Sequence, residues 1–249
     1  MTSVLALRLA GPLQSWGASA RFARRTTETA PTKSGVTGLL AAALGRDRKA
    51  DLTDLAALRF AVRIDQPGTR IRDFQTAHHT DTDKAMPVSQ RFYLADAVFV
   101  AAVAGDDALI STLHAAVRAP VYLPYLGRRS CPPQGPVDLG IRNVRDPVEA
   151  LKTEEWQASH WYREQRRHDR TVTLTILGEG TADDRHGDAL KDQPISFDPR
   201  HRRYGLRSVV SSAVDVPNPR FISAGRNRRA PVPVPRHEPE ALLSPMDGP

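Results

Sequence analysis

Residues 31–45, with the sequence PTKSGVTGLLAAALG, place Lys33 and Ser34 directly before an apolar run. A hydroxyl at the start of a helix can cap the first N–H groups, and the positive end of the helix dipole attracts anions there. A Walker A loop would require a glycine-rich turn ending in Gly-Lys-Ser or Gly-Lys-Thr, and no glycine precedes Lys33 at that spacing. The segment therefore argues against an ATPase. It predicts either an ordinary capped helix or a helix start that attracts a negatively charged group.

The charge of the chain points to an extended polyanion as partner. The net charge is +7, and 30 of the 35 basic residues are Arg. Arginine binds phosphate through two parallel hydrogen bonds and stacks on bases. A chain that needs its charge only for solubility could use lysine instead. GC-rich coding is the competing explanation for this Arg content. The 249 residues, 40% of them apolar, suffice for a core in one large domain or two small ones.

The single cysteine, Cys131, excludes an intramolecular disulfide and is expected to be a packed thiol. No apolar run approaches the roughly 18 residues of a membrane-spanning helix. Arg8 interrupts the place where a signal peptide would carry its apolar region. We therefore expect a cytoplasmic protein with no membrane partner.

Hydrophobic periodicity predicts a strand, a helix, two strands, a second helix and a fourth strand in the first part of the chain. Their expected ranges are 3–10, 35–44, 58–65, 92–103, 106–118 and 137–144. This βαββαβ order is typical of ferredoxin-like and RNA-recognition folds. A polar insertion at residues 75–91 separates the second and third strands.

The pattern weakens after Asp146. A charged segment covers residues 154–170, and strands expected at 171–177 and 204–214 could form a small appended sheet. From residue 217 onward the chain is rich in proline and lacks periodicity, which is typical of a disordered tail. We therefore divide the chain into residues 1–144, a small β-rich extension at 145–216 and a tail at 217–249.

Three blocks, RLAGPLQSWG at residues 8–17, PTKSGVTGLLAAALG at 31–45 and YLGRRSCPP at 125–133, carry a family resemblance. With supporting signals at 72–76 and 204–210, the sequence resembles the CasD family of subunits of the type I-E CRISPR surveillance complex Cascade. The resemblance implies an α+β fold with a ferredoxin-like, RRM-like βαββαβ palm, a thumb hairpin inserted at about 75–91 and a small C-terminal β extension. It also implies binding of the 5′ handle of CRISPR RNA, contacts with the CasA large subunit and the CasC backbone subunit, and access to target DNA through the assembled complex.

The same resemblance implies the RNA-binding residues. They come from the helix start, the segment before it, the thumb, and the Gly-rich loop at 127–135 with the tyrosine just before it. We expect them to be Lys33, Ser34, Arg24, Arg25, His78, Arg91, Tyr125, Arg128, Arg129 and Ser130. Glycines at both ends of that loop let its backbone approach phosphate closely. The alternatives are an ordinary Arg-bearing loop, a solvated surface hairpin at 75–91, and core packing for Tyr122 and Tyr125.

An endoribonuclease that processes repeat RNA without metal is the rival function. Metal-free cleavage needs a base, an acid and a cation, and His78 or His79 with Tyr125 and Lys33 are conceivable in those roles. Nothing in the sequence brings them together, and the family leaves cutting to a separate subunit, CasE, so we expect no catalysis and no cofactor. The run HHTDTD at 78–83 lacks metal-ligand spacing and predicts no metal site. A stand-alone RNA-recognition domain would need exposed aromatic residues on its two central strands. In this sequence the alternation of the corresponding strands, 58–65 and 92–103, favours packing on both faces instead.

Overall fold

The computed structural model describes residues 1–18, 24–180, 187–198 and 200–223, and these form a mixed α/β protein. The predicted tail at 217–249 falls largely outside these ranges, so its disorder stays a prediction. Within the described ranges, no helix is long and apolar enough to cross a membrane.

Seven antiparallel strands form the main sheet, in the order β10-β11-β9-β4-β7-β1-β8. Four of these strands alternate along the chain with two longer helices in the predicted βαββαβ order. They are β1 (Thr2–Ala10), α1 (Lys33–Ala43), β4 (Arg59–Gln66), β7 (Val98–Asp106), α3 (Asp107–Arg118) and β8 (Asp138–Arg142). The N-caps are Thr32 for α1 and Asp106 for α3, and each accepts a hydrogen bond from the first turn of its helix.

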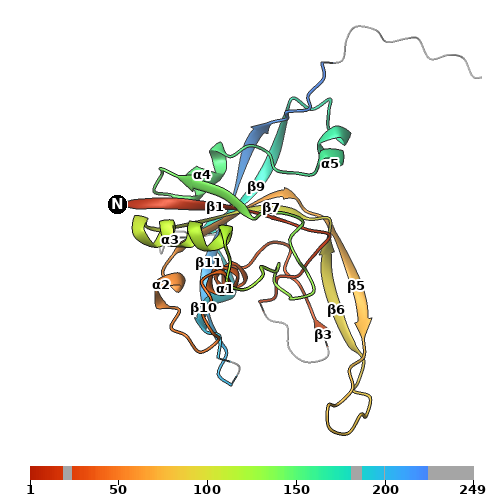
Figure 1. The fold of residues 1–249 in the computed structure, drawn as a ribbon. Coiled ribbons are helices and arrows are strands. Elements are labelled where there is room, and N and C mark those ends of the chain that lie inside the picture. Colours follow the sequence, from red (N-terminus) through yellow and green to blue (C-terminus); the bar gives the residue numbers. More distant parts are fainter. Residues whose placement is uncertain (19–23, 181–186, 199, 224–249) are drawn as a thin grey trace, which may run out of the picture.

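The two faces of the main sheet carry side chains of different size. Leu5, Leu7 and Leu9 of β1 pack with α1 and α3, while Val4 points to the opposite face. That opposite face is lined by alanines of β4 and β7, and it holds the short helix α4 (Pro147–Thr153). Figure 1 shows α1, α3 and the one-turn helix α2 (Thr53–Ala56) on one side of the sheet and α4 on the other. Covering both faces explains why β1 and β7 are apolar along most of their length.

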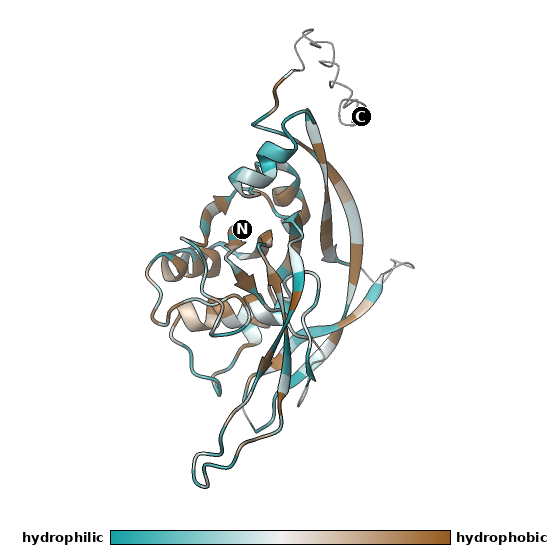
Figure 2. Ribbon diagram, turned by 90° about the vertical axis from the view of Figure 1, so that its right-hand side faces the viewer, coloured by the Kyte–Doolittle hydropathy of each residue, from teal (hydrophilic) through white to brown (hydrophobic). Residues whose placement is uncertain are grey.

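The prediction of a single third strand at 92–103 is wrong. The segment belongs to two strands, β6 (Ser89–Ala95) and β7, and the break between them is at Asp96, whose φ is 56°. Aspartate tolerates this left-handed conformation better than most residues. The insertion is also larger than the predicted 75–91, because β5 (Thr69–Gln75) pairs with β6 along its whole length. Figure 2 shows this hairpin projecting from the body of the protein, with a mostly hydrophilic tip.

Gly68 turns the chain from β4 into the hairpin. Its φ is +72°, and a Cβ at this position would lie 2.5 Å from the carbonyl oxygen of Ala95. A side chain would therefore push the base of the hairpin away from β7, and glycine is the residue that fits.

The C-terminal strands, for which the sequence allows a small appended sheet, extend the main sheet. β9 (Thr171–Glu179) pairs with β4, and β11 (Arg203–Pro217) and β10 (Asp188–Ser196) continue the main sheet beyond it. The strand β10 was not predicted. The physical reason for the shared sheet is the free edge of β4, whose N–H and C=O groups would otherwise lack partners.

Candidate nucleic-acid interface

The second sheet gathers arginines from three parts of the chain around β6. β5 occupies one edge of β6, and β2 (Leu13–Gln14) and β3 (Arg24–Arg25) occupy the other. In the parallel pairing of β3 with β6, Arg24 lies opposite Gln90 and Arg25 opposite Arg91. Both β3 arginines are exposed, so this short strand presents two cations beside the hairpin.

Aromatic rings hold several of the guanidinium groups in place. The Arg24 and Arg70 guanidiniums lie 5.5 and 4.7 Å from the ring centroid of Phe92, and Arg72 lies 4.9 Å from that of Phe74. Cation–π contacts of this kind orient a guanidinium while leaving N–H groups available for phosphate.

One face of the hairpin is both basic and apolar. Arg70, Arg72 and Phe74 are every second residue of β5, so their side chains share a face, and all three are exposed. The Phe74 side chain is 54% exposed, which is unusual for a phenylalanine. A ring held beside cations can stack on an unstacked base while the cations neutralise the neighbouring backbone phosphates.

The Gly-rich loop lies against the base of the hairpin. Gly127 has a φ of +82°, and a Cβ there would fall 1.8 Å from the carbonyl oxygen of Ser15, so only glycine fits. The backbone N–H of Leu126 donates to the carbonyl of Cys131 at 2.7 Å and closes the turn. Cys131 is buried in the main core, as expected of a packed thiol, and burial raises the pKa of that thiol. The adjoining Arg129 and Ser130 are exposed.

The Arg128 side chain binds other groups of the protein. Its guanidinium donates to the carbonyl of Phe92 at 3.2 Å and to that of Arg25 at 2.9 Å, and it covers the ring of Tyr93. These contacts tie the loop to β3 and β6. Arg128 and Arg129, both expected to bind RNA, therefore differ: Arg128 contacts the protein itself, and Arg129 is exposed.

Residues 14–16 have a structural role. The Gln14 side chain is buried and donates to the carbonyls of Leu9 and Ala97, and it accepts from the indole N–H of Trp16. Trp16 is fully buried, and a Cβ on Gly35 would lie 2.7 Å from its ring. This block thus joins β1, the base of the hairpin and α1.

The helix start at Lys33 and Ser34 meets carboxylates of the protein itself. The backbone N–H of Lys33 donates to Asp192 at 2.8 Å, and Arg207 binds the same carboxylate through two nitrogens at 2.9 and 2.8 Å. The Lys33 ammonium forms an ion pair with Glu179 at 2.8 Å, and its side chain is only 6% exposed. Ser34 is also buried. In the structure, Glu179 of β9 and Asp192 of β10 supply the negative charge that faces this helix start, which argues against the predicted phosphate contact.

The other predicted site residues are dispersed. His78 lies at the exposed hairpin tip, where its Nδ1 is 3.0 Å from the carbonyl oxygen of Asp83. Arg91 and Tyr125 are half-buried, Arg91 on β6 and Tyr125 in the loop. In Figure 1 the hairpin tip lies far from α1, so His78 is not near Lys33. Among the described residues, no group of three His, Cys, Asp or Glu side chains could hold a metal ion.

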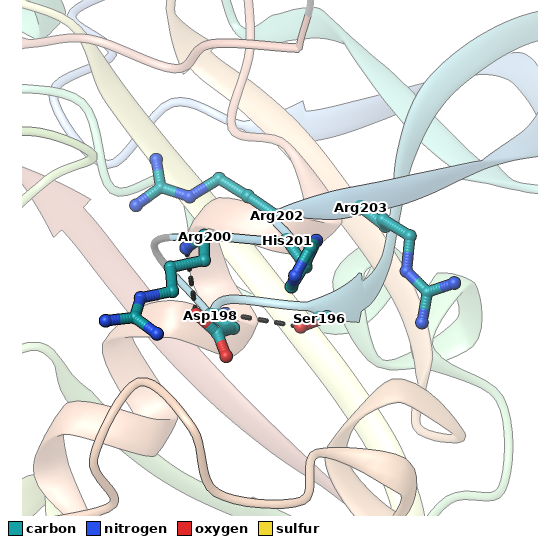
Figure 3. Close-up of a pocket in the computed structure, with 6 residues that line it drawn as sticks. All are labelled: Ser196, Asp198, Arg200, His201, Arg202 and Arg203. Atoms are coloured by element: carbon teal, nitrogen blue, oxygen red, sulfur yellow. Dashed lines mark hydrogen bonds between the residues drawn. The ribbon is translucent and has the colours of Figure 1, made fainter.

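A second basic feature lies at the turn between β10 and β11. Its open cavity of about 660 Å³ is lined by Ser196, Asp198, Arg200, His201, Arg202 and Arg203. Backbone N–H groups of Asp198 and Arg200 donate to Ser196 Oγ and to Asp198 Oδ1. Figure 3 shows the three arginine side chains pointing in different directions. They do not converge on one point, so this turn is a weaker candidate than the hairpin.

Sequence reasoning missed Arg70, Phe74 and Phe92 as members of the interface. The available signal was the alternation of Arg70, Ile71, Arg72, Asp73 and Phe74, which puts two arginines and an aromatic on one face of a strand. The expected strand at 92–103 places Phe92 in one strand with the residues of β7, because the local pattern does not reveal the break at Asp96.

The fold and this surface define a mixed α/β protein that carries a basic, aromatic hairpin beside a Gly-rich loop. Residues 4–210 match the family model of the CRISPR-associated protein Cas5. The chain is 40% identical over 186 residues to the CRISPR system Cascade subunit CasD of Escherichia coli (strain K12), covering 66% of this chain and 83% of that protein. The chain belongs to the Cas5 family of CRISPR-associated proteins.

Two solved structures resemble this one. A crystal structure of a Cas protein has 36% sequence identity and a TM-score of 0.67, covering 88% of this chain and 98% of that chain. A chain of a CRISPR RNA-guided surveillance complex has 35% identity and a TM-score of 0.71, covering 90% and 95%. The resemblance to the CasD family that the three sequence blocks indicate is confirmed.

Proposed function

We propose that this protein is the subunit of a type I-E Cascade complex that binds the 5′ handle of CRISPR RNA and does not cut it. The single observation that carries the proposal is the row of exposed arginines and aromatic rings around β6, next to the exposed Arg129 and Ser130 of the Gly-rich loop. Relatedness to a Cascade subunit and to a chain of an RNA-guided complex supports it.

The strand order supports a ferredoxin-like palm. Within the main sheet, β4, β7, β1 and β8 are neighbours in that order, and the helices that follow β1 and β7 pack on the same face. This is the split βαβ arrangement. We assign the hairpin of β5 and β6 as the thumb, and β9 to β11 as the C-terminal extension of the palm sheet.

In this assignment the handle passes between the thumb and the Gly-rich loop. Arg24, Arg25 and Arg129 neutralise phosphates, and Arg70 and Arg72 hold the backbone beside the hairpin. Phe74 stacks on a base that the handle exposes, which is the way single-stranded RNA is usually read. Arg128 keeps the loop and β3 at the correct separation for these contacts.

Binding without cleavage is favoured by the placement of the residues that a nuclease would need. The Lys33 ammonium is paired with Glu179, and His78 lies at the hairpin tip beside Asp83. A cation, a base and an acid must converge within hydrogen-bond reach of one 2′-OH and its phosphate. Contacts with CasA and CasC, target DNA reached through the complex, and a cytoplasmic location complete the proposal.

Co-purification tests the proposed function. The tagged full chain, co-expressed with a CRISPR array and the other Cascade subunits, should retain CRISPR RNA with an intact 5′ handle. The variant Arg24→Ala with Arg25→Ala should lose most of that RNA, whereas the control Arg48→Ala with Lys49→Ala, which removes two exposed cations elsewhere, should keep it. A wild-type chain that joins no RNA and no other subunit contradicts the proposal, and so does one that cuts repeat RNA alone.

A further inference from the structure

The segment around α5 (His160–Gln165) forms a second basic and aromatic surface, away from the hairpin. In Figures 1 and 2, α5 lies at the opposite end of the protein from the hairpin, on the side of the main sheet that holds α4. Five arginines lie on α5, the loop after it and the neighbouring C-terminal segment, against two carboxylates, Glu164 and Asp169. They are Arg163, Arg166, Arg167, Arg170 and Arg220.

This surface is anchored firmly on the palm. The Ser159 N–H and hydroxyl both donate to the side-chain oxygen of Gln66, at 3.1 and 2.7 Å, and the indole N–H of Trp156 donates to the carbonyl of Asp65. Tyr162 packs edge to face against buried Trp156, with ring centroids 6.0 Å apart. α5 therefore has a fixed orientation relative to β4.

The arginine-rich loop after α5 is held by the segment that follows β11. The Asn218 side chain donates to the carbonyl of Arg166 at 2.7 Å, and its backbone N–H donates to that of Arg170 at 3.0 Å. The N–H of Ile222 donates to the carbonyl of Arg167 at 2.8 Å. A basic loop whose backbone is already ordered loses little entropy when it binds a ligand.

Exposed rings accompany these cations. Trp161 is 49% exposed and Phe221 is 40% exposed, although each is large and apolar. Trp161 packs edge to face on Tyr162, with ring centroids 5.6 Å apart. The Arg166 guanidinium lies 5.1 Å from the centroid of the same Tyr162 ring. Nothing in the proposed handle site uses these residues.

We propose that the α5 surface, formed by Trp161, Arg166, Arg167, Arg170, Arg220 and Phe221, is a second binding site for single-stranded nucleic acid. Arginines on an ordered loop neutralise successive phosphates, and an exposed indole stacks on a base. A duplex has its base faces stacked inside and offers no partner to the ring, so the combination selects single strands. The ligand is either RNA beyond the handle or the single DNA strand that an RNA-guided complex displaces.

Tryptophan fluorescence provides a direct test, because Trp161 is the only exposed tryptophan. Trp16 and Trp156 are 0% and 1% exposed, so a base that quenches emission by stacking must reach Trp161. The full chain is titrated at low salt with oligouridylate, with oligodeoxythymidylate, each about 12 nucleotides long, and with a blunt DNA duplex of the same length. We expect quenching by at least one single strand and markedly less by the duplex.

Matched variants separate this site from the handle site. Arg167→Ala with Arg170→Ala should weaken the quenching titration about tenfold, because two charge-assisted contacts are lost. Arg48→Ala with Lys49→Ala should leave it unchanged, and so should the handle variant Arg24→Ala with Arg25→Ala. Trp161→Phe should abolish the quenching signal while the circular dichroism spectrum is retained. A preference for the uridylate strand would indicate RNA as the ligand, and a preference for the thymidylate strand would indicate displaced DNA.

Three results would overturn the proposal: no quenching by either single strand, equal quenching by the duplex, or unchanged titration of the Arg167 and Arg170 variant. Because Arg24 and Arg25 lie outside this surface, quenching that disappears only in their variant would also refute it, and would place the bound strand at the hairpin.

Discussion

The guanidinium of Arg128 lies 4.8 Å from the centroid of the Tyr93 ring and joins the Gly-rich loop to the base of the hairpin. The same group donates to the carbonyls of Phe92 and Arg25, so one side chain holds together a loop and two strands that are distant in sequence. Its neighbour Arg129 does not take part in these contacts and is exposed. Two adjacent arginines therefore have different roles, and they should respond differently to substitution.

Arg129→Ala should weaken binding of handle RNA and lower the slope of log affinity against log salt by about 0.7, the value for one phosphate contact on a single strand. Its free energy of unfolding should stay within about 0.5 kcal/mol of the wild type, as is usual for exposed sites. Fluorescence anisotropy with labelled handle RNA at several salt concentrations measures the slope. An unchanged slope would remove Arg129 from the interface.

Arg128→Ala should act mainly on stability. Two carbonyls lose a donor and a ring loses its covering cation, at a cost of about 1–2 kcal/mol in unfolding free energy. Urea denaturation measures this cost, and Arg128→Lys serves as the comparison, since an ammonium cannot reproduce both hydrogen bonds with stacking. A variant as stable as the wild type, yet with a lower salt slope, would restore Arg128 as a phosphate ligand.

Glu179→Gln should destabilise the protein because it leaves the buried Lys33 ammonium without its counter-charge. The expected loss is up to about 3 kcal/mol, near the lower end for buried pairs, since Glu179 keeps partial access to water. The double variant Lys33→Met with Glu179→Leu should recover most of that loss. Urea unfolding of Lys33→Met, Glu179→Leu and the double variant gives the coupling energy, and a value near zero would argue against the pair.

RNA binding by Lys33→Met provides the complementary measurement. Because the ammonium faces Glu179 and the adjacent helix start faces Asp192, handle affinity should change little under conditions where the variant is folded. A large loss of affinity with unchanged stability would mean that the sequence-based assignment of Lys33 to a phosphate was correct.

Replacing residues 77–88 by a short Gly-Ser turn should preserve the palm, because the hairpin tip contributes no residue to the described core clusters. If the hairpin is a thumb that separates nucleotides, chemical probing of the assembled complex should show a base at the junction of handle and spacer becoming protected. Contacts from Arg24, Arg25 and Arg129 should remain, so overall affinity should fall only modestly. An unchanged probing pattern would mean that the tip does not touch the RNA.

Cys131 offers a test of the folded loop itself. Burial raises the pKa of its thiol, so less thiolate is present in the native protein than in the unfolded chain at the same pH. Labelling by an aromatic disulfide reagent should therefore be slow in the native state and fast in concentrated urea, and the native profile should be displaced to higher pH. Immediate stoichiometric reaction of the native protein at neutral pH would show that the loop opens.

Much of the fold follows from local pattern. Apolar alternation in β1 and the spacing of Leu109, Ile110, Leu113 and Val117 in α3 indicated their element types. Strands β1, β4 and β8 and the two long helices appear within a few residues of the expected positions, whereas β7 begins only at Val98. Side-chain periodicity reports which face is buried without knowledge of the partner. It failed at Asp96, where one apolar stretch serves two sheets and only a left-handed residue marks the break.

The sequence by itself determined the element order, the capped start of α1, the family and the abundance of arginine. The tertiary structure decided which charges are free to bind a ligand. Lys33 and Arg128 are bound by groups far away in the chain. Asp192, for example, accepts a hydrogen bond from the backbone N–H of Lys33, 159 residues away. A cation has the same local signature whether a distant carboxylate, a carbonyl or a phosphate faces it. Only the packing of β9 and β10 on α1, and of the loop on the hairpin, distinguishes those partners.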